Sequence, residues 1–216
     1  SPFPRWGDAF CKEVISSRVE TTKTLAKAIA AAEQPPRAWV LITGVGIGGD
    51  FDFFSRLVSS WEAAALIPGS PTRAVVVRSG VVLGRDGGAI SQMLLPFRLG
   101  LGGPVGSGLQ PFPWIHIQDL CGIVCHALEQ DSVRGVLNGV SPSSPGTSNG
   151  GFARALGAVL GRPALLPVPA WAVRAALGAE RAGMLLQGQR VLPKRTLESG
   201  YQFTFPELPA ALKDIV

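Results

Sequence analysis

Three glycines, Gly44, Gly46 and Gly49, have the spacing G-x-G-x-x-G, which can hold the pyrophosphate of a dinucleotide. Residues 39–43 before them are apolar or β-branched and predict a buried strand, and a helical pattern begins a few residues later. In that arrangement backbone amides at a helix N-terminus face the phosphate charge, and Arg78 after the next strand would bind an NADP 2′-phosphate. The alternative interpretation is a tight turn that binds nothing, and the pattern alone leaves both open.

Two cysteines, Cys121 and Cys125, stand four residues apart with His126 beside them. A zinc site needs three or four converging ligands. The surrounding residues 120–128 are apolar, so we interpret both cysteines as core residues and expect no metal site.

A histidine and an aspartate, His116 and Asp119, are close enough in sequence to form an acid–base pair. The simpler interpretation makes Asp119 the cap of the helix that follows and His116 a strand residue near a domain boundary. Both interpretations remain open from the sequence.

Helices and strands alternate along the first part of the chain, which predicts a parallel α/β sheet. The runs 39–43 and 74–83 are continuous and apolar, so we expect adjacent parallel strands that are buried on both faces. Residues 141–151 are rich in Ser, Pro and Gly and predict an exposed loop. The other expected elements are helices at 8–33, 53–65, 89–97, 119–130, 152–160, 171–177, 184–191 and 208–215, and strands at 112–117, 136–140 and 201–205.

Charge and composition exclude several classes of protein. The net charge is +5, but the 20 Lys and Arg are scattered, so we expect no nucleic-acid partner. No run of 18 apolar residues exists, so we expect no membrane. Three cysteines, an odd and low count, indicate reduced thiols and an intracellular protein. The first residue is Ser1 and not Met, so we expect a processed or partial product.

Motifs along nearly the whole chain together resemble an atypical extended short-chain dehydrogenase/reductase of the epimerase family, group 39U. This resemblance implies an α/β fold with a Rossmann-like, NAD(P)-binding parallel sheet and a small C-terminal α+β domain. We therefore expect the domains to be residues 1–140 and 141–216. The residues that carry the resemblance are RWGDAFCKEVISSRVETT (5–22), PPRAWVLITGV (35–45), FFSRLVSSWEAAA (53–65), RAVVVRSGVVLGRDGGA (73–89), PFRLGLGGPVGSG (96–108), PFPWIHIQDL (111–120), GVLNGVSPS (135–143) and LLQGQRVLPKRTLESGYQFTFPEL (185–208).

The resemblance also implies which residues touch NADP(H). Glu13 and Arg18, on the first helix, would lie near the cofactor, and Arg18 carries a guanidinium suited to a phosphate or ribose. Without the resemblance, Arg18 is equally well an ordinary solvated helix residue. Val82 would approach the nicotinamide end, and residues 114–120 would line the substrate side.

The sequence departs from the family in three places. The opening strand and glycine loop of the GGTGFIG kind are absent, and two further strands are expected to be missing with them. The connection after residues 42–45 is shorter than in the family, which explains how Gly44, Gly46 and Gly49 came together in a tight turn. The Tyr-x-x-x-Lys of ordinary short-chain dehydrogenases is also absent, because the only tyrosine, Tyr201, has Phe205 four residues on.

These observations lead to one expectation and two alternatives. We expect a shortened form of an NADP-dependent oxidoreductase with an unknown small-molecule substrate, unknown catalytic residues, and weak or lost NADP binding in this chain. One alternative is a non-enzymatic α/β interaction module. The other is a self-contained nucleotide-binding domain that uses residues 44–49.

Overall fold

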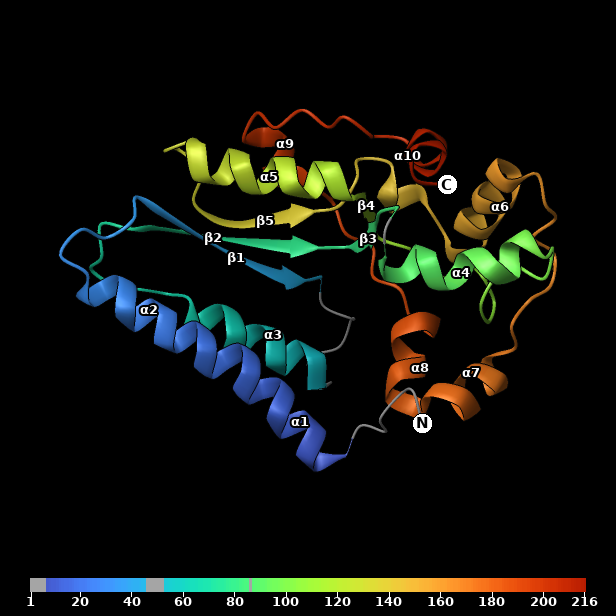
Figure 1. Ribbon diagram of the computed structural model, residues 1–216, viewed down its shortest axis with the longest axis horizontal. Helices are drawn as coiled ribbons and strands as arrows, with labels where there is room; N and C mark the ends of the chain where they lie inside the picture. Colours follow the sequence, from blue (N-terminus) through green and yellow to red (C-terminus); the bar gives the residue numbers. More distant parts are fainter. Residues whose placement is uncertain (1–6, 46–52, 86) are drawn as a thin grey trace.

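The computed structural model describes residues 7–45, 53–85 and 87–216. Its centre is a parallel sheet of β1 (Ala38–Gly44), β2 (Arg73–Ser79) and β5 (Gly135–Gly139), in the order β1-β2-β5. Helices α1 (Asp8–Ile15), α2 (Thr21–Ala31) and α3 (Phe53–Ala64) lie along one face, and α5 (Ile117–Glu129) lies along the other (Figure 1). The predicted parallel α/β sheet with β1 beside β2 is confirmed.

The predicted helix 8–33 is one continuous helical rod with a local irregularity. A π-helical turn, Ser16–Glu20, joins α1 to α2 and turns Val19 into the core. The helix ends at Ala31, before Pro35 and Pro36, because a residue that precedes proline is disfavoured in helical geometry.

The predicted strand 74–83 is two strands in two sheets. β2 ends at Ser79, and after Gly80 the chain enters β3 (Val81–Leu83), which pairs in parallel with β4 (Trp114–His116). A side chain at Gly80 would lie 2.8 Å from the carbonyl oxygen of Pro113. The chain therefore changes sheets at the residue where a close backbone approach requires glycine.

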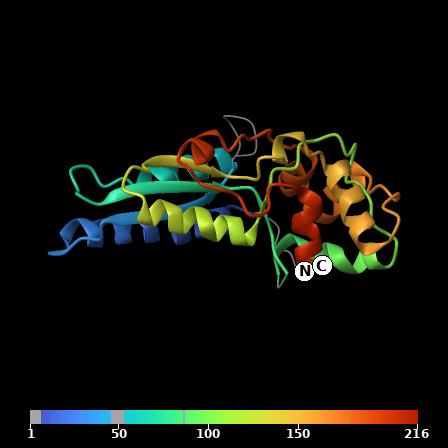
Figure 2. The same ribbon diagram turned by 90° about the horizontal axis from the view of Figure 1, so that it is seen from above.

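A second core lies beyond β3 and β4 and contains Trp114, Phe152 and Leu212, each at most 2% exposed. Figure 2 shows the helices around it at one end of the molecule and the three-stranded sheet at the other. The elements of this end are α4 (Gly88–Arg98), the 3-10 turn Ser144–Gly146, α6 (Asn149–Leu160), α7 (Ala170–Leu177), α8 (Ala179–Leu186) and α10 (Leu208–Ile215); a short helix, α9 (Lys194–Glu198), packs on β5. The division of the chain at 140 and 141 stays a prediction.

Three sequence predictions about local structure were wrong. Residues 141–151 are mostly half-buried or buried, because the Ser141 hydroxyl donates to Pro206 O and the Ser144 hydroxyl accepts from Trp114 N. Polar groups with such partners can be buried at little cost. The helix predicted at 184–191 ends at Leu186, and residues 201–205 form an extended segment outside any strand.

β1 is one of the two edge strands of the described sheet, and the prediction that it is fully buried was wrong. Ile42 is 44% exposed, and Leu128 on the covering helix α5 is 42% exposed. One side of β1 pairs with β2, and its other side pairs with no described strand. An apolar edge of this kind is the place where a further strand and helix would pack.

Candidate functional site

A cavity of about 260 Å³ opens where β1 and β2 end. The carboxyl ends of parallel strands meet at one edge of a sheet, and in open α/β folds ligands bind there. The cavity also receives the segment after α8, so it lies between the sheet and the second core. Its lining residues are Gly44, Val45, Ser79–Val81, Gln110–Pro113, Asn149, Leu185 and Gln187–Gln189.

Among the residues that the structure describes, the cavity is lined by apolar groups, amides and a hydroxyl, and none of these lining residues carries a charged side chain. Two hydrogen bonds hold the Gln110 side chain in place, because its Nε2 donates to Val105 O and to Leu185 O, each at 2.9 Å. Asn149, 8% exposed, accepts from Val105 N at 2.7 Å through its Oδ1. Such a lining suits a flat, uncharged group that exchanges amide hydrogen bonds.

A second cavity of about 510 Å³ adjoins the first and shares Val45 and Gln189 with it. Its wall carries three cations, Arg78, Arg190 and Lys194. Arg78 forms a two-point pair with Glu62 of α3, from Nε to Oε1 at 2.7 Å and from Nη2 to Oε2 at 2.6 Å. These hydrogen bonds raise the pKa of the Arg78 guanidinium.

The pairing of Arg78 bears on the glycine turn. Thr43 Oγ1 donates to the same Glu62 Oε1 at 3.1 Å, so the Arg78 fork is part of a packed network beneath the sheet edge. Glu62 already balances the charge of this guanidinium and occupies two of its five N–H donors, which weakens its attraction for an NADP 2′-phosphate. Gly44 has ordinary backbone geometry and open space around its Cα, whereas Gly46 and Gly49 lie outside the described residues.

The predicted cofactor residues Glu13, Arg18 and Val82 lie on separate elements. Glu13 is exposed on α1, and Arg18 lies in the π-helical turn with its Cζ 5.6 Å from the centre of the Trp61 ring. Val82 pairs with Ile115 in the two-stranded sheet, next to the cavity residue Val81. Their role toward a cofactor stays a prediction.

His116 and Asp119 do not face each other as an acid–base pair. The Nε2 of His116 lies 3.2 Å from the Asp214 carboxylate, and its Nδ1 accepts from Gln118 N at 3.2 Å, so His116 is the residue that caps α5. Asp119 is fully buried and accepts from Thr204 N at 2.7 Å and Phe205 N at 2.9 Å. The prediction of Asp119 as the cap was therefore wrong, because its partners lie more than 80 residues away.

The tyrosine hydroxyl of Tyr201 donates to Asp119 Oδ1 at 3.1 Å. Burial, together with the neighbouring Asp119 carboxylate, raises the pKa of Tyr201 above its ordinary value of 10.0. A catalytic tyrosine needs a lowered pKa, so Tyr201 is a structural residue.

A raised pKa in the folded state predicts that folding stability is complete below pH 10 and falls as the pH rises further. We expect Tyr201→Phe to lower the free energy of unfolding by about 1 kcal/mol at pH 8, through the lost hydrogen bond, and to weaken that alkaline decline. Urea unfolding at pH 8 and 10.5 measures both. Because Tyr201 is the only tyrosine, tyrosinate absorbance titrates it alone. An ordinary titration near pH 10 in the folded protein would contradict the assignment.

Cys121 and Cys125 are exposed on α5, so the prediction that they are core residues was wrong. Leu120, Ile123 and Ala127 occupy the buried face of the helix instead. Across the part of the chain that the structure describes, no three His, Cys, Asp or Glu side chains are grouped as a metal site requires. In the same part, every helix is too short or too polar to cross a bilayer.

Comparison with known proteins places the chain beside one group. The bovine epimerase family protein SDR39U1 is 63% identical over 230 residues, which cover 100% of this chain and 78% of the relative. The human protein of the same name is 62% identical with the same coverage. The crystal structure of human SDR39U1 (isoform 2) with NADPH superposes with a TM-score of 0.94 at 61% identity, covering 98% of this chain and 76% of that one. Residues 168–215 match a family described as a domain of unknown function, DUF1731.

Proposed function

The chain belongs to this epimerase family, and we propose that it functions as an NADP(H)-dependent oxidoreductase with a small-molecule substrate. The observation that carries the proposal is the uncharged cavity at the carboxyl ends of β1 and β2. It lies in a chain whose backbone closely matches that of a human protein crystallised with NADPH.

The cavity fits the nicotinamide end of the cofactor. The amides of Gln110, Asn149 and Gln189 surround it, and amide groups can exchange hydrogen bonds with a carboxamide. When bound, the cofactor would supply hydride transfer. This chain's residues would hold the ring at the sheet edge and exclude water through Phe112 and Leu185.

The phosphate end fits the described residues less well. The described sheet begins at β1, and no described turn presents glycine amides at a helix N-terminus beside that edge. Arg18 and Glu13 are the charged residues that we assign to the edge of the cofactor. We therefore propose that this chain by itself binds NADP(H) weakly.

No catalytic residue is assigned, because the described part of the cavity lining contains no Tyr, Lys, His or carboxylate that could transfer a proton. We place the protein inside the cell, since its cysteines Cys11, Cys121 and Cys125 are all free thiols. We propose no nucleic-acid partner.

Saturation-transfer NMR tests the site, because it detects weak ligands and reports which of their protons touch the protein. With NADPH in excess, we expect stronger saturation of the nicotinamide protons than of the adenine protons. Val45→Trp would fill the junction of the two cavities and should at least halve the nicotinamide signal. Leu66→Trp, at a 63% exposed position elsewhere, is the matched control and should leave it unchanged. Stronger adenine saturation, or a signal that Val45→Trp does not alter, would show that the cavity does not hold nicotinamide.

A further inference from the structure

Six large apolar side chains are exposed at the end of the molecule that is farthest from the amino ends of the strands. They come from the end of α4, the turn after it, the connector between α6 and α7, and the start of α7 (Figure 1). We call them the leucine–tryptophan surface: Leu95 (67% exposed), Leu99 (64%), Leu101 (57%), Leu165 (78%), Leu166 (51%) and Trp171 (73%). Side chains this exposed and this apolar are unusual as a group on a soluble domain.

Backbone contacts hold these segments side by side. Leu101 N donates to Pro96 O at 2.9 Å, which folds the turn back onto the end of α4. Leu166 N donates to Gly102 O at 3.2 Å, so the connector runs along the same turn. Figures 1 and 2 place α4 and α7 at the same end of the molecule. The six side chains therefore belong to one region.

Exposed arginines accompany this surface. Arg98, Arg162 and Arg174 are exposed and alternate along the chain with its leucines and Trp171. Residues 88–118 and 132–179 contain five arginines and no Asp or Glu, whereas the other 15 cations of the chain balance its 15 acids. Four of these arginines, Arg98, Arg154, Arg162 and Arg174, lie on α4, on α6, in the connector after α6 and on α7 at this end of the molecule, whereas Arg134 precedes β5 at the opposite end.

We propose that the leucine–tryptophan surface docks on an anionic lipid membrane. Leucine and tryptophan side chains enter the boundary between headgroups and acyl chains, and arginines bind lipid phosphates around them. The six side chains are each more than half exposed, and none of them lines either cavity described above. A second copy of the chain would bring arginines against arginines across a two-fold contact, which is repulsive.

This contact is peripheral, and it changes one expectation from the sequence. The expectation of no membrane rested on the absence of an apolar run long enough to span, whereas an interfacial contact needs no spanning segment. The proposal is independent of the proposed oxidoreductase function, since the surface shares no residue with the two cavities.

Flotation with lipid vesicles tests the proposal, because vesicle-bound protein rises through a density gradient while aggregated protein sinks. The probes are vesicles of phosphatidylcholine with about 30% phosphatidylserine and vesicles of phosphatidylcholine alone. The two kinds of vesicle differ in surface charge. We expect flotation with the first and little with the second, together with a shift of tryptophan emission to shorter wavelength. Equal flotation with both vesicles, or flotation with neither, would overturn the proposal.

Two sets of variants locate the contact. Leu165→Glu with Leu166→Glu should weaken vesicle binding by about 100-fold or more, because it removes apolar area and adds charge that anionic lipid repels. Leu66→Glu with Leu192→Glu, at positions 63% and 60% exposed, is the matched control and should weaken binding far less. Far-UV circular dichroism should show that both double variants keep the secondary structure of the original protein.

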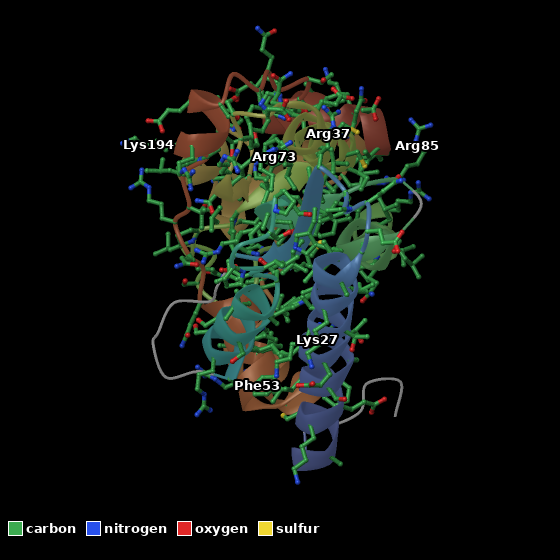
Figure 3. The ribbon with its side chains drawn as sticks, turned by 90° about the vertical axis from the view of Figure 1, so that its left-hand side faces the viewer. Lys27, Arg37, Phe53, Arg73, Arg85 and Lys194 are labelled. Atoms are coloured by element: carbon green, nitrogen blue, oxygen red, sulfur yellow. The ribbon has the colours of Figure 1, made fainter. Side chains whose placement is uncertain are left out.

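The charge is tested in the same way. Arg98→Gln, Arg162→Gln and Arg174→Gln together should weaken binding by about 100-fold. Lys12→Gln, Lys27→Gln and Arg37→Gln remove the same charge from α1, α2 and the turn after α2, on the side of the molecule seen in Figure 3, and should have a much smaller effect. Equal losses in the two triple variants would overturn the docking site. A dimer in sedimentation that Leu165→Glu dissociates would overturn the membrane as occupant.

Discussion

Asp119→Ala is expected to lower the free energy of unfolding by about 3–5 kcal/mol, the largest effect of any single substitution considered for this protein. The Asp119 carboxylate is fully buried and accepts from the backbone N–H groups of Thr204 and Phe205 and from the hydroxyl of Tyr201. Truncation leaves the N–H groups of Thr204 and Phe205 without their partner, while the Tyr201 hydroxyl keeps the Asp119 backbone carbonyl at 3.1 Å. Each unsatisfied donor costs about 1–3 kcal/mol. Equilibrium unfolding in urea, followed by circular dichroism, measures the loss.

Two variants control this prediction. Asp119→Asn keeps an oxygen for Thr204 N but turns an amide toward Phe205 N, so its loss should be intermediate. Asp131→Ala removes a carboxylate that is 76% exposed and 3.6 Å from Arg73, and should cost less than about 1 kcal/mol. If Asp119→Ala proved no more destabilising than Asp131→Ala, the segment 201–205 would not be held by Asp119.

The sequence was sufficient to predict the central sheet and most helices. The runs 39–43 and 74–79 are apolar, continuous and separated by one helical pattern, which specifies adjacent parallel strands. The terminal helix 208–215 matches α10 residue for residue, because its apolar positions have a helical period. Local pattern is enough in these cases because the decisive contacts are close in sequence.

Features that depend on distant partners could not be predicted. Residues 74–83 read as one strand, since the change of sheet at Gly80 depends on the approach of Pro113 and Val140. Asp119 read as a helix cap, because nothing near it in sequence indicates that Thr204 and Phe205 donate to it. Burial of residues 141–151 likewise depends on Pro206, 65 residues beyond Ser141.

The candidate site shows the same limit. Motifs directed attention to the glycine turn, to His116 and to the cysteine pair, whereas the cavity is lined by Gln110, Asn149 and residues 187–189. Amide side chains in loops have no spacing that marks them, and they meet only when three distant segments come together. The family resemblance indicated the correct fold, and a human protein of that family is crystallised with NADPH, while Glu13, Arg18 and Val82 stay predictions.

Affinity for NADPH is expected to be much lower in this chain than in a longer form of it, and this is the largest effect on binding that we predict. The cofactor pyrophosphate carries two negative charges that are held in such folds by glycine-loop amides at a helix N-terminus. In this chain, we propose that Arg18 and the carboxyl-edge cavity contact only the two ends of the cofactor. Loss of two or three charge-assisted hydrogen bonds, at about 1.5–3 kcal/mol each, weakens binding by at least about three powers of ten.

A chimera provides the longer form. It carries the segment of the human relative that precedes the aligned region, joined ahead of this chain. We expect the chimera to bind NADPH, and Arg18→Ala to weaken that complex by about tenfold. Lys12→Ala, an exposed cation of the same helix, is the matched control and should leave the affinity unchanged.

The most direct test is a fluorescence titration of NADPH against this chain, its Gly46→Val variant and the chimera. The predicted result is no saturable micromolar binding by the chain or by Gly46→Val, and micromolar or tighter binding by the chimera. Micromolar binding by the chain that disappears in Gly46→Val would contradict this account and identify the turn at residues 44–49 as the phosphate site. Absence of binding in all three would contradict the oxidoreductase assignment and favour a non-enzymatic interaction module.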